Sequence, residues 1–275
     1  MNLIYNEVEV LNKLLNEGKC DIKKDLLIGI LVKYYYINGI EDKLQIREKV
    51  LETLYKTDHN ATRNIWLGCT QNKIEGIISA IKRGDVPLEL FEISDVDIYE
   101  EELKTIESSG QVRYKKFLFI LLVWAKVYKK CHRTVIKEEP SFLLKKSKCK
   151  SGNDDYRMDL LGELRELGFI EANYIKDKCN IKINYLKEEG EIAFTVDDIE
   201  NAIYYYLNWS GEKWIKCSEC DKRWIKKTNN KVRYCRDCAK KISNKQKSEY
   251  KNKVKNTKKC KRRKIEIQKN TSQTK

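Results

Sequence analysis

The sequence predicts an α+β fold that is mainly helical. It comprises a helical N-terminal region, a winged-helix-like middle region and a small cysteine-bearing C-terminal module that ends in a basic tail. Three observations lead to this prediction. Only two prolines, Pro87 and Pro140, interrupt 275 residues, which favours long helices. In the middle of the chain, helical patterns are followed by strand-like segments. Two closely spaced cysteine pairs and most of the excess positive charge lie in the last quarter.

The first 110 residues are expected to form a helical domain, because apolar residues recur there at intervals of three and four. The helices predicted in this region cover residues 4–16, 25–37, 43–56 and 60–83. Gly18 stops the first helix, and the last pattern fits one long helix or two. A weak apolar alternation predicts a short strand over 86–96, and a helix follows over 99–106.

Residues 111–210 are expected to form a second, winged-helix-like domain. The predicted elements are helices over residues 114–130, 141–146 and 154–167 and strands over 180–186 and 191–196. A turn at Glu189-Gly190 would join the two strands into a hairpin. Three helices followed by a hairpin is the order of a winged helix-turn-helix.

The third helix of this region carries an unfavourable charge for reading DNA. Residues 153–167 contain five acidic and two basic residues, a net charge of −3. A helix in the major groove lies between phosphates, so this charge opposes binding. The preceding basic loop, with Lys145, Lys146, Lys148 and Lys150, could still contact phosphate. The alternatives are that the domain binds a protein or has only a structural role.

Two Cys-x-x-Cys pairs predict a metal site. Cys217 and Cys220 form the first pair, and Cys235 and Cys238 follow after fourteen residues. This spacing is close to that of zinc-binding modules, in which four thiolates surround one ion tetrahedrally. Four thiolates leave no open coordination position, so we expect one structural Zn²⁺. Reduced structural cysteines or a redox dithiol are the alternatives.

A zinc-binding module over residues 211–240 is expected to have a treble-clef or zinc-ribbon-like order. A strand over 222–227, a turn at 228–230 and a return strand over 231–234 would bring the second cysteine pair back to the first. A helix would begin at Ala239. So short a segment needs its metal to fold. The other cysteines are expected to be small buried residues or inert surface thiols: Cys20, Cys69, Cys131, Cys149, Cys179 and Cys260.

The charge of the chain is strongly divided. Residues 1–210 hold 32 Lys and Arg against 35 Asp and Glu, whereas residues 211–275 hold 24 against 6, a net charge of +18. The tail over 241–275 has few apolar residues, so we expect it to be largely disordered or helical. Such polarity indicates an acidic partner, which could be nucleic acid, an anionic membrane or an acidic protein. A solvated tail that only improves solubility is the alternative.

Basic and aromatic residues alternate in the zinc-binding module, a pattern that suits phosphate contact and base stacking. Trp224 and Tyr234 are expected to be exposed. The residues expected to contact DNA or RNA are Lys222, Arg223, Trp224, Lys226, Lys227, Lys231, Arg233, Arg236, Lys240, Lys241, Lys258, Lys259, Lys261, Arg262, Arg263 and Lys264. Lysines outnumber arginines 44 to 12. Lysine contacts phosphate as a point charge, so we expect little sequence preference.

The sequence does not indicate an enzyme. His59 and His132 lie in no recognisable catalytic motif, and phosphate-binding glycine loops, GxSxG and HExxH are absent. The pairs Asp154-Asp155 and Asp197-Asp198 lie near predicted helix starts, where carboxylates cap free N–H groups. The longest apolar run, residues 117–125, is far below the roughly 20 residues needed to cross a bilayer. The first residues show no export signal. We therefore expect a non-enzymatic, cytoplasmic protein with no membrane partner.

The run Tyr206–Cys217, continued by Tyr234–Lys241, resembles uncharacterised proteins of phages and mobile elements from low-GC Gram-positive bacteria. Tyr5-Asn6 and Lys33–Tyr35 are similar to the N-terminal pattern of those proteins. The resemblance implies a helical N-terminal part, a winged-helix-like middle, a C-terminal zinc ribbon with a basic end and a place in the bacterial host cytosol. It implies no particular chemistry.

Two functions remain open at this point. The first is a zinc-containing nucleic-acid-binding protein, a phage-type regulator of transcription or replication that grips phosphates through its basic C-terminal end. The second is a protein-binding inhibitor or adaptor that blocks a host nucleic-acid enzyme or defence complex, as anti-CRISPR proteins do. In the second case the basic end would occupy a surface normally used by DNA or RNA.

Overall fold

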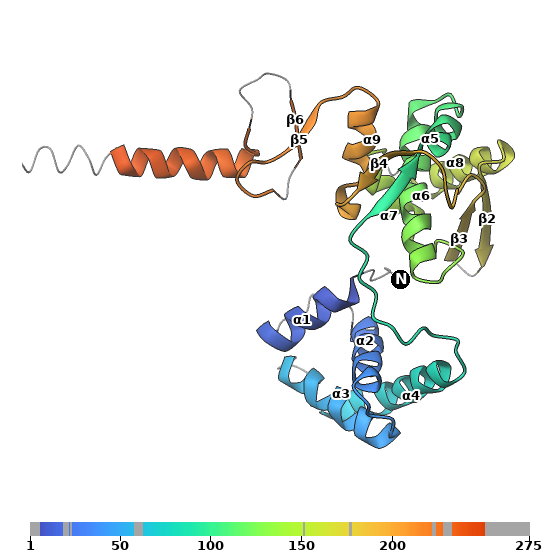
Figure 1. Cartoon of the computed structure of the whole chain (residues 1–275), viewed down its shortest axis with the longest axis vertical. Coiled ribbons are helices and arrows are strands. Elements are labelled where there is room, and N and C mark those ends of the chain that lie inside the picture. Colours follow the sequence, from blue (N-terminus) through green and yellow to red (C-terminus); the bar gives the residue numbers. More distant parts are fainter. Residues whose placement is uncertain are drawn as a thin grey trace, which may run out of the picture. The chain divides into compact units, whose positions relative to one another are not determined.

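The computed structural model is an α+β protein, mainly helical, with small antiparallel sheets (Figure 1). The structure describes residues 6–18, 22, 24–57, 63–150, 152–175, 178–221, 224–227 and 233–250. The chain divides into two compact units, a first unit over residues 1–203 and a second unit over residues 204–275. The predicted α+β class with a helical majority is confirmed.

Four helices form the N-terminal part of the first unit. They are α1 (Glu7–Glu17), α2 (Lys24–Ile37), α3 (Lys43–Thr57) and α4 (Arg63–Lys82). The side chain of Asn6 caps α1 by accepting the N–H of Glu9. Gly18 ends α1 with a φ of 63°, a left-handed conformation that glycine adopts without strain. The helices predicted here are confirmed, the last as a single helix.

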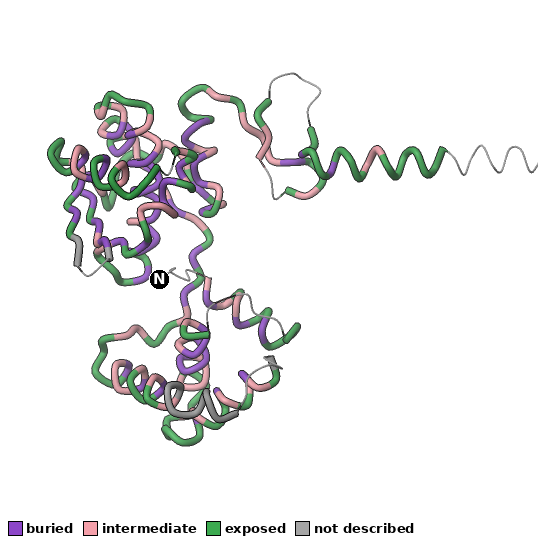
Figure 2. Tube along the Cα trace, turned by 180° about the vertical axis from the view of Figure 1, so that it is seen from behind, coloured by how far each residue is buried: buried purple, intermediate pink, exposed green. Residues whose placement is uncertain are grey.

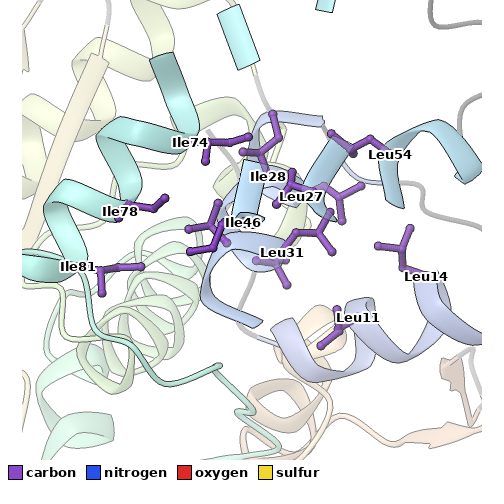
Figure 3. Close-up of a cluster of buried hydrophobic side chains, with 13 residues drawn as sticks. Leu11, Leu14, Leu27, Ile28, Leu31, Ile46, Leu54, Ile74, Ile78 and Ile81 are labelled. Atoms are coloured by element: carbon purple, nitrogen blue, oxygen red, sulfur yellow. The ribbon is translucent and has the colours of Figure 1, made fainter. Parts of the chain in front are cut away.

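The side chains of these four helices meet in one buried cluster (Figure 3). α2 is apolar nearly all round, and its residues Ile30, Leu31 and Val32 are at most 1 % exposed. It packs against α1, α3 and α4. Full burial of each such aliphatic side chain contributes about 1.5–3 kcal/mol. Packing on α2 therefore holds this part of the unit together.

A buried ion pair fastens α1 and α2 to the segment that follows α4. Lys33 Nζ lies 2.9 Å from Glu7 Oε2, and it also donates to the carbonyl oxygen of Glu89 at 3.2 Å. Glu7 Oε2 accepts the N–H of Phe91 at 3.1 Å. The backbone N–H of Glu7 also donates to the carbonyl oxygen of Phe91 at 2.7 Å, and Asn6 and Glu92 form an isolated antiparallel bridge. Of the strand predicted over residues 86–96, only this bridge and the strand that begins at Val96 are present, so the prediction is wrong for the remaining residues.

The strands pair differently from the prediction. The hairpin predicted between residues 180–186 and 191–196 is wrong. The strands are β1 (Val96–Tyr99), β2 (Ile170–Ile175), β3 (Lys178–Ile183) and β4 (Ile192–Val196). β2 pairs with β3, and β1 pairs with β4, both antiparallel. The buried side chain of Tyr185 donates to the carbonyl oxygen of Leu118 at 2.7 Å. The chain therefore turns into the core after β3 instead of running on into β4.

The remaining described helices of the first unit follow β1 in the chain. They are α5 (Glu100–Glu107), α6 (Val112–Lys130), α7 (Pro140–Lys146), α8 (Asp154–Glu166) and a 3-10 helix, η1 (Ile199–Asn201). Every residue from Phe117 to Trp124 is at most 2 % exposed, and the buried trace is purple in Figure 2. The three middle helices predicted from the sequence are confirmed, and α6 supplies the core of this part.

Glu102 joins four segments of the first unit. Its carboxylate is fully buried and lies 2.9 Å from Lys126 Nζ. The same carboxylate accepts the backbone N–H groups of Tyr99 and Lys187, each at 2.9 Å. Burial lowers the pKa of Lys126, and the hydrogen bond with Glu102 opposes that shift. The network ties α5 and α6 to β1 and to the loop between β3 and β4.

The second unit begins within α9 (Ile203–Trp209). It continues through β5 (Trp214–Lys216), β6 (Trp224–Lys226) and a helix over residues 236–250. β6 pairs antiparallel with β5, which precedes the first cysteine pair. The predicted return strand is therefore wrong for Arg233 and Tyr234, which lie in no strand, while residues 231–232 lie outside the described residues.

Candidate metal centre and basic surface

The four cysteines of the two pairs come together in the second unit. The sulfur atoms of Cys217, Cys220, Cys235 and Cys238 all lie within 4.8 Å of one another. Four sulfurs arranged tetrahedrally around zinc at about 2.3 Å are separated by about 3.8 Å. The cluster is thus close to the size that a bound ion requires, and the spacing-based prediction of one four-cysteine site is consistent with this geometry.

Short local elements place each sulfur. Cys217 follows β5 directly, and a turn after it returns the N–H of Asp221 to the Cys217 carbonyl oxygen at 2.9 Å. The N–H of Ser218 donates to the carbonyl oxygen of Arg233 at 3.0 Å, which links the first pair to the approach of the second. Cys238 lies in the first turn of the helix over residues 236–250. The site therefore joins the small sheet to the start of that helix.

Cys217, Cys235 and Cys238 are buried, Cys220 is half-buried, and ionisation of one sulfur opposes ionisation of its neighbours. Burial opposes ionisation of Cys217, but backbone N–H groups of Cys235, Cys220 and Glu219 stabilise its thiolate and lower the pKa to about 6. The pKa of Cys238 is raised to about 12, first by its hydrogen bond with Cys235 and then by burial. A thiolate is thus favoured at Cys217. A bound cation would stabilise further thiolates at the neighbouring sulfurs, which otherwise repel one another.

The donor set fits zinc. Four soft sulfur ligands suit Zn²⁺, which has no geometric preference of its own and accepts a tetrahedral S₄ site. Cys217, Cys235 and Cys238 are each at most 7 % exposed, and Ile225 packs against them. With four protein ligands there is no open position for substrate or water. A zinc ion held by all four sulfurs would therefore have a structural rather than a catalytic role.

An aromatic cluster beside the metal centre was not predicted. The ring of Trp224 stacks on Tyr204 with centroids 5.1 Å apart and an angle of 9°, and Tyr205 packs edge-on against it. Tyr204 also packs against Trp214 at 4.8 Å. The side chain of Asn208 accepts the N–H of Trp214 and donates to its carbonyl oxygen. The run of tyrosines in α9, followed by two tryptophans, was the only sequence signal for this packing.

The basic residues predicted to contact nucleic acid fall into two groups. Outside the described residues lie Lys222, Arg223, Lys231, Lys258, Lys259, Lys261, Arg262, Arg263 and Lys264. The other basic residues of this set are described and exposed: Lys226, Lys227, Arg233, Arg236, Lys240 and Lys241. Lys226 is partly neutralised by Glu212 at 2.8 Å. Tyr234 is 40 % exposed, as expected, whereas Trp224 is half-buried against the two tyrosines.

The helix over residues 236–250 presents a basic face. Arg236, Lys240 and Lys247 are separated by four and seven residues, which places them on one side of a helix. All three are exposed. Because Cys238 lies in the first turn of this helix, the four-sulfur cluster is joined directly to the end at which the basic face begins.

The acidic pairs and the other cysteines behave as structural groups. Asp154 and Asp155 lie in the first turn of α8 after its cap, and the side chain of Asp198 caps η1 by accepting the N–H of Asn201. Cys131 is buried, and burial raises its pKa to about 11. Cys179 is buried and Cys149 half-buried. Cys20, Cys260 and the side chain of Cys69 lie outside the described residues.

Comparisons of the chain with protein-family models, with curated proteins and with solved structures gave no match. Among the helices of the described residues, none combines the length and the apolar character needed to cross a membrane.

Proposed function

We propose that the protein is a zinc-containing, non-enzymatic nucleic-acid-binding protein that grips phosphates through its second unit. One observation carries the proposal: the four sulfurs that fit zinc lie at the start of a helix whose exposed face is basic. A cation that orders the sulfurs also anchors that helix. The basic face, together with the lysine-rich residues that follow in the sequence, then supplies the positive charge that attracts phosphates.

Affinity from this surface depends on charge more than on base sequence. The described basic side chains are mainly lysines on an exposed helix, and lysine lacks the planar fork with which arginine reads guanine. Tyr234, next to a metal ligand and 40 % exposed, is the aromatic side chain placed to stack on an unpaired base. Binding should therefore be strong at low salt and weakly selective.

A winged-helix fold for the middle region is supported by the order of its elements. α6, α7 and α8 are followed by the β2–β3 hairpin, and Ile136, between α6 and α7, makes a bridge to Ile181 of β3. This is the order of three helices, an intervening short strand and a wing. The exposed side of α8 carries Asp155, Met158 and Asp159, so it is poorly suited to the major groove.

The acidic surface of α8 also favours a second candidate function. A helix with exposed carboxylates and a 46 % exposed methionine suits a protein partner better than DNA. In this alternative the chain is an inhibitor or adaptor that blocks a host nucleic-acid enzyme or defence complex. A phage-type role in a bacterial cytosol would suit either function.

Electrophoretic mobility shift at rising salt tests the first function. The logarithm of the affinity should fall linearly with the logarithm of the salt concentration, with a slope of about −0.9 per neutralised phosphate of duplex DNA. A chain truncated before residue 239 should lose most of this affinity. Retention of affinity by the truncated chain would contradict the proposal. Capture of a host protein from nuclease-treated lysate, with no affinity for DNA or RNA, would support the alternative instead.

A further inference from the structure

A cavity of about 320 Å³ lies in the first unit, between α2, α4, the segment after α4 and the end of α6. Its apolar wall consists of Leu26, Ile30, Ile77, Val86, Pro87 and Phe91. Ile30 and Phe91 are 1 % and 7 % exposed, and the other four wall residues are half-buried. A mainly apolar hollow of this size, with a few polar groups at its edge, has the form of a small-molecule site.

Gly29 keeps part of the cavity open. It lies in the middle of α2, where glycine makes a helix less stable than alanine would. Outside the backbone of its own helix, a Cβ atom at this position would meet no heavy atom within 4 Å. A larger side chain would fit sterically and would occupy the hollow. The sequence therefore combines a less stable helix with an open cavity.

Most charged side chains around the cavity form a pair with another side chain, whereas Arg133 does not pair with a carboxylate of the described residues. Four pairs of oppositely charged or hydrogen-bonded side chains involve its lining residues: Lys33–Glu7 at 2.9 Å, Lys73–Asp25 at 2.7 Å, Arg83–Asp85 at 2.7 Å and His132–Glu89 at 2.7 Å. Arg133 also lines the cavity, and its guanidinium carbon lies 5.9 Å from the centroid of the Tyr128 ring. Within the part of the chain that the structure describes, no carboxylate pairs with it. Arg133 is thus available to an anion.

We propose that this cavity binds a small apolar carboxylate. The hydrocarbon part would lie against Ile30, Ile77 and Phe91, and the carboxylate would accept hydrogen bonds from the guanidinium of Arg133. Arginine binds carboxylates with two parallel hydrogen bonds, which gives this end of the site its specificity. Gly29 provides the volume for the ligand.

Isothermal titration of the full-length protein with two probes tests this site. The probes are 2-naphthoate, an aromatic carboxylate, and decanoate, an aliphatic one. At least one of them should bind saturably with one molecule per chain. The neutral amide 2-naphthamide replaces 2-naphthoate to measure the contribution of the charge, and it should bind about tenfold more weakly. The carboxylate that binds more tightly shows whether the site prefers an aromatic or an aliphatic ligand.

Three variants locate the binding. Gly29→Leu should abolish it, because the side chain fills the cavity. Gly76→Leu is the matched control: Gly76 lies within α4, is exposed and has equal free space, so binding should be unchanged. Arg133→Gln should weaken carboxylate binding about tenfold without affecting the amide. Circular dichroism confirms that each variant is folded, and Arg133→Gln remains decisive if Gly29→Leu does not fold.

The proposal is overturned by any of three results. The first is that neither carboxylate binds. The second is that a carboxylate binds equally well to the folded Gly29→Leu variant, which would place the ligand elsewhere. The third is that 2-naphthoate and 2-naphthamide bind with the same affinity, which would remove the role of Arg133.

Discussion

The backbone N–H of Cys235 donates to the sulfur of Cys217 at 3.2 Å, across 18 positions of the chain. This hydrogen bond joins the two cysteine pairs and stabilises a thiolate on the more buried sulfur. It is therefore a tertiary contact, and it also favours the negative charge on Cys217 that a cation would bind. The small second unit has few other buried apolar groups near the sulfurs, so its order depends on this centre.

Substitution Cys235→Ser should release the metal and unfold the region after Trp214. Purified wild-type protein should contain one zinc per chain, and the variant substantially less. Zinc bound to small four-ligand modules contributes about 10–16 kcal/mol of apparent free energy, far more than this unit can replace by packing. Elemental analysis measures the metal, and limited proteolysis reports the unfolding.

Cys149→Ser is the matched control, because Cys149 is half-buried in the first unit and far in sequence from the four-sulfur cluster. It should retain its zinc. Wild-type protein that is freshly purified, reduced and free of zinc would show that the cluster is not a zinc site.

Replacing the basic face of the last helix should change the salt dependence of nucleic-acid binding. The double variant Lys240→Gln with Lys247→Gln removes two phosphate contacts, so the log–log slope should become shallower by about two. Fluorescence anisotropy with a labelled duplex at several salt concentrations measures the slope.

Lys43→Gln with Lys104→Gln is the charge-matched control, because both lysines are exposed on helices of the first unit. Its slope should equal that of the wild type. Equal slopes for both double variants would mean that the helix over residues 236–250 does not contact phosphate.

Substitution Glu102→Gln should destabilise the first unit by about 3–5 kcal/mol, because it leaves the Lys126 ammonium buried without its counter-charge. Urea denaturation followed by circular dichroism measures the change in the free energy of unfolding. Glu52→Gln removes one partner of an exposed pair with Lys56, and because solvent screens that pair, it should lower the stability far less than Glu102→Gln does. A Glu102→Gln variant as stable as Glu52→Gln would contradict the role of the buried network.

Alkylation of Cys131 should be slow at neutral pH and should accelerate as the pH rises. Burial raises its pKa to about 11, so its thiolate fraction is about 0.1 % at pH 8. Each further unit of pH should raise the rate about tenfold until the pH approaches the pKa. Mass spectrometry of iodoacetamide-treated protein gives the rate at this site. A pH-independent rate would show that local opening, rather than ionisation, limits the reaction.

The helices could be predicted from the sequence because their signals are local. Apolar spacing located α1 to α4, Gly18 marked the end of α1, and the spacing of the cysteines identified the four-sulfur cluster. The helix signals are set by residues within a few turns of one another, and the two cysteine pairs are recognisable from their spacing although they meet across 18 positions.

The strand pairings could not be predicted in the same way. β1 pairs with β4, about a hundred residues further along the chain, and Glu102 holds the backbone of Lys187 in the loop before β4, another contact between residues distant in the sequence. The stacking of Trp224 on Tyr204 is likewise a tertiary contact, which hides a ring that the sequence suggested was exposed. Alternation of residue types does not identify such partners.

The most direct test is the affinity of the full-length protein for a labelled DNA or RNA duplex at low salt, measured before zinc removal, after chelation and after zinc is restored. We expect tight binding, a marked loss on chelation and recovery with one equivalent of zinc. Affinity that stays the same throughout, or no affinity at any stage, would contradict it.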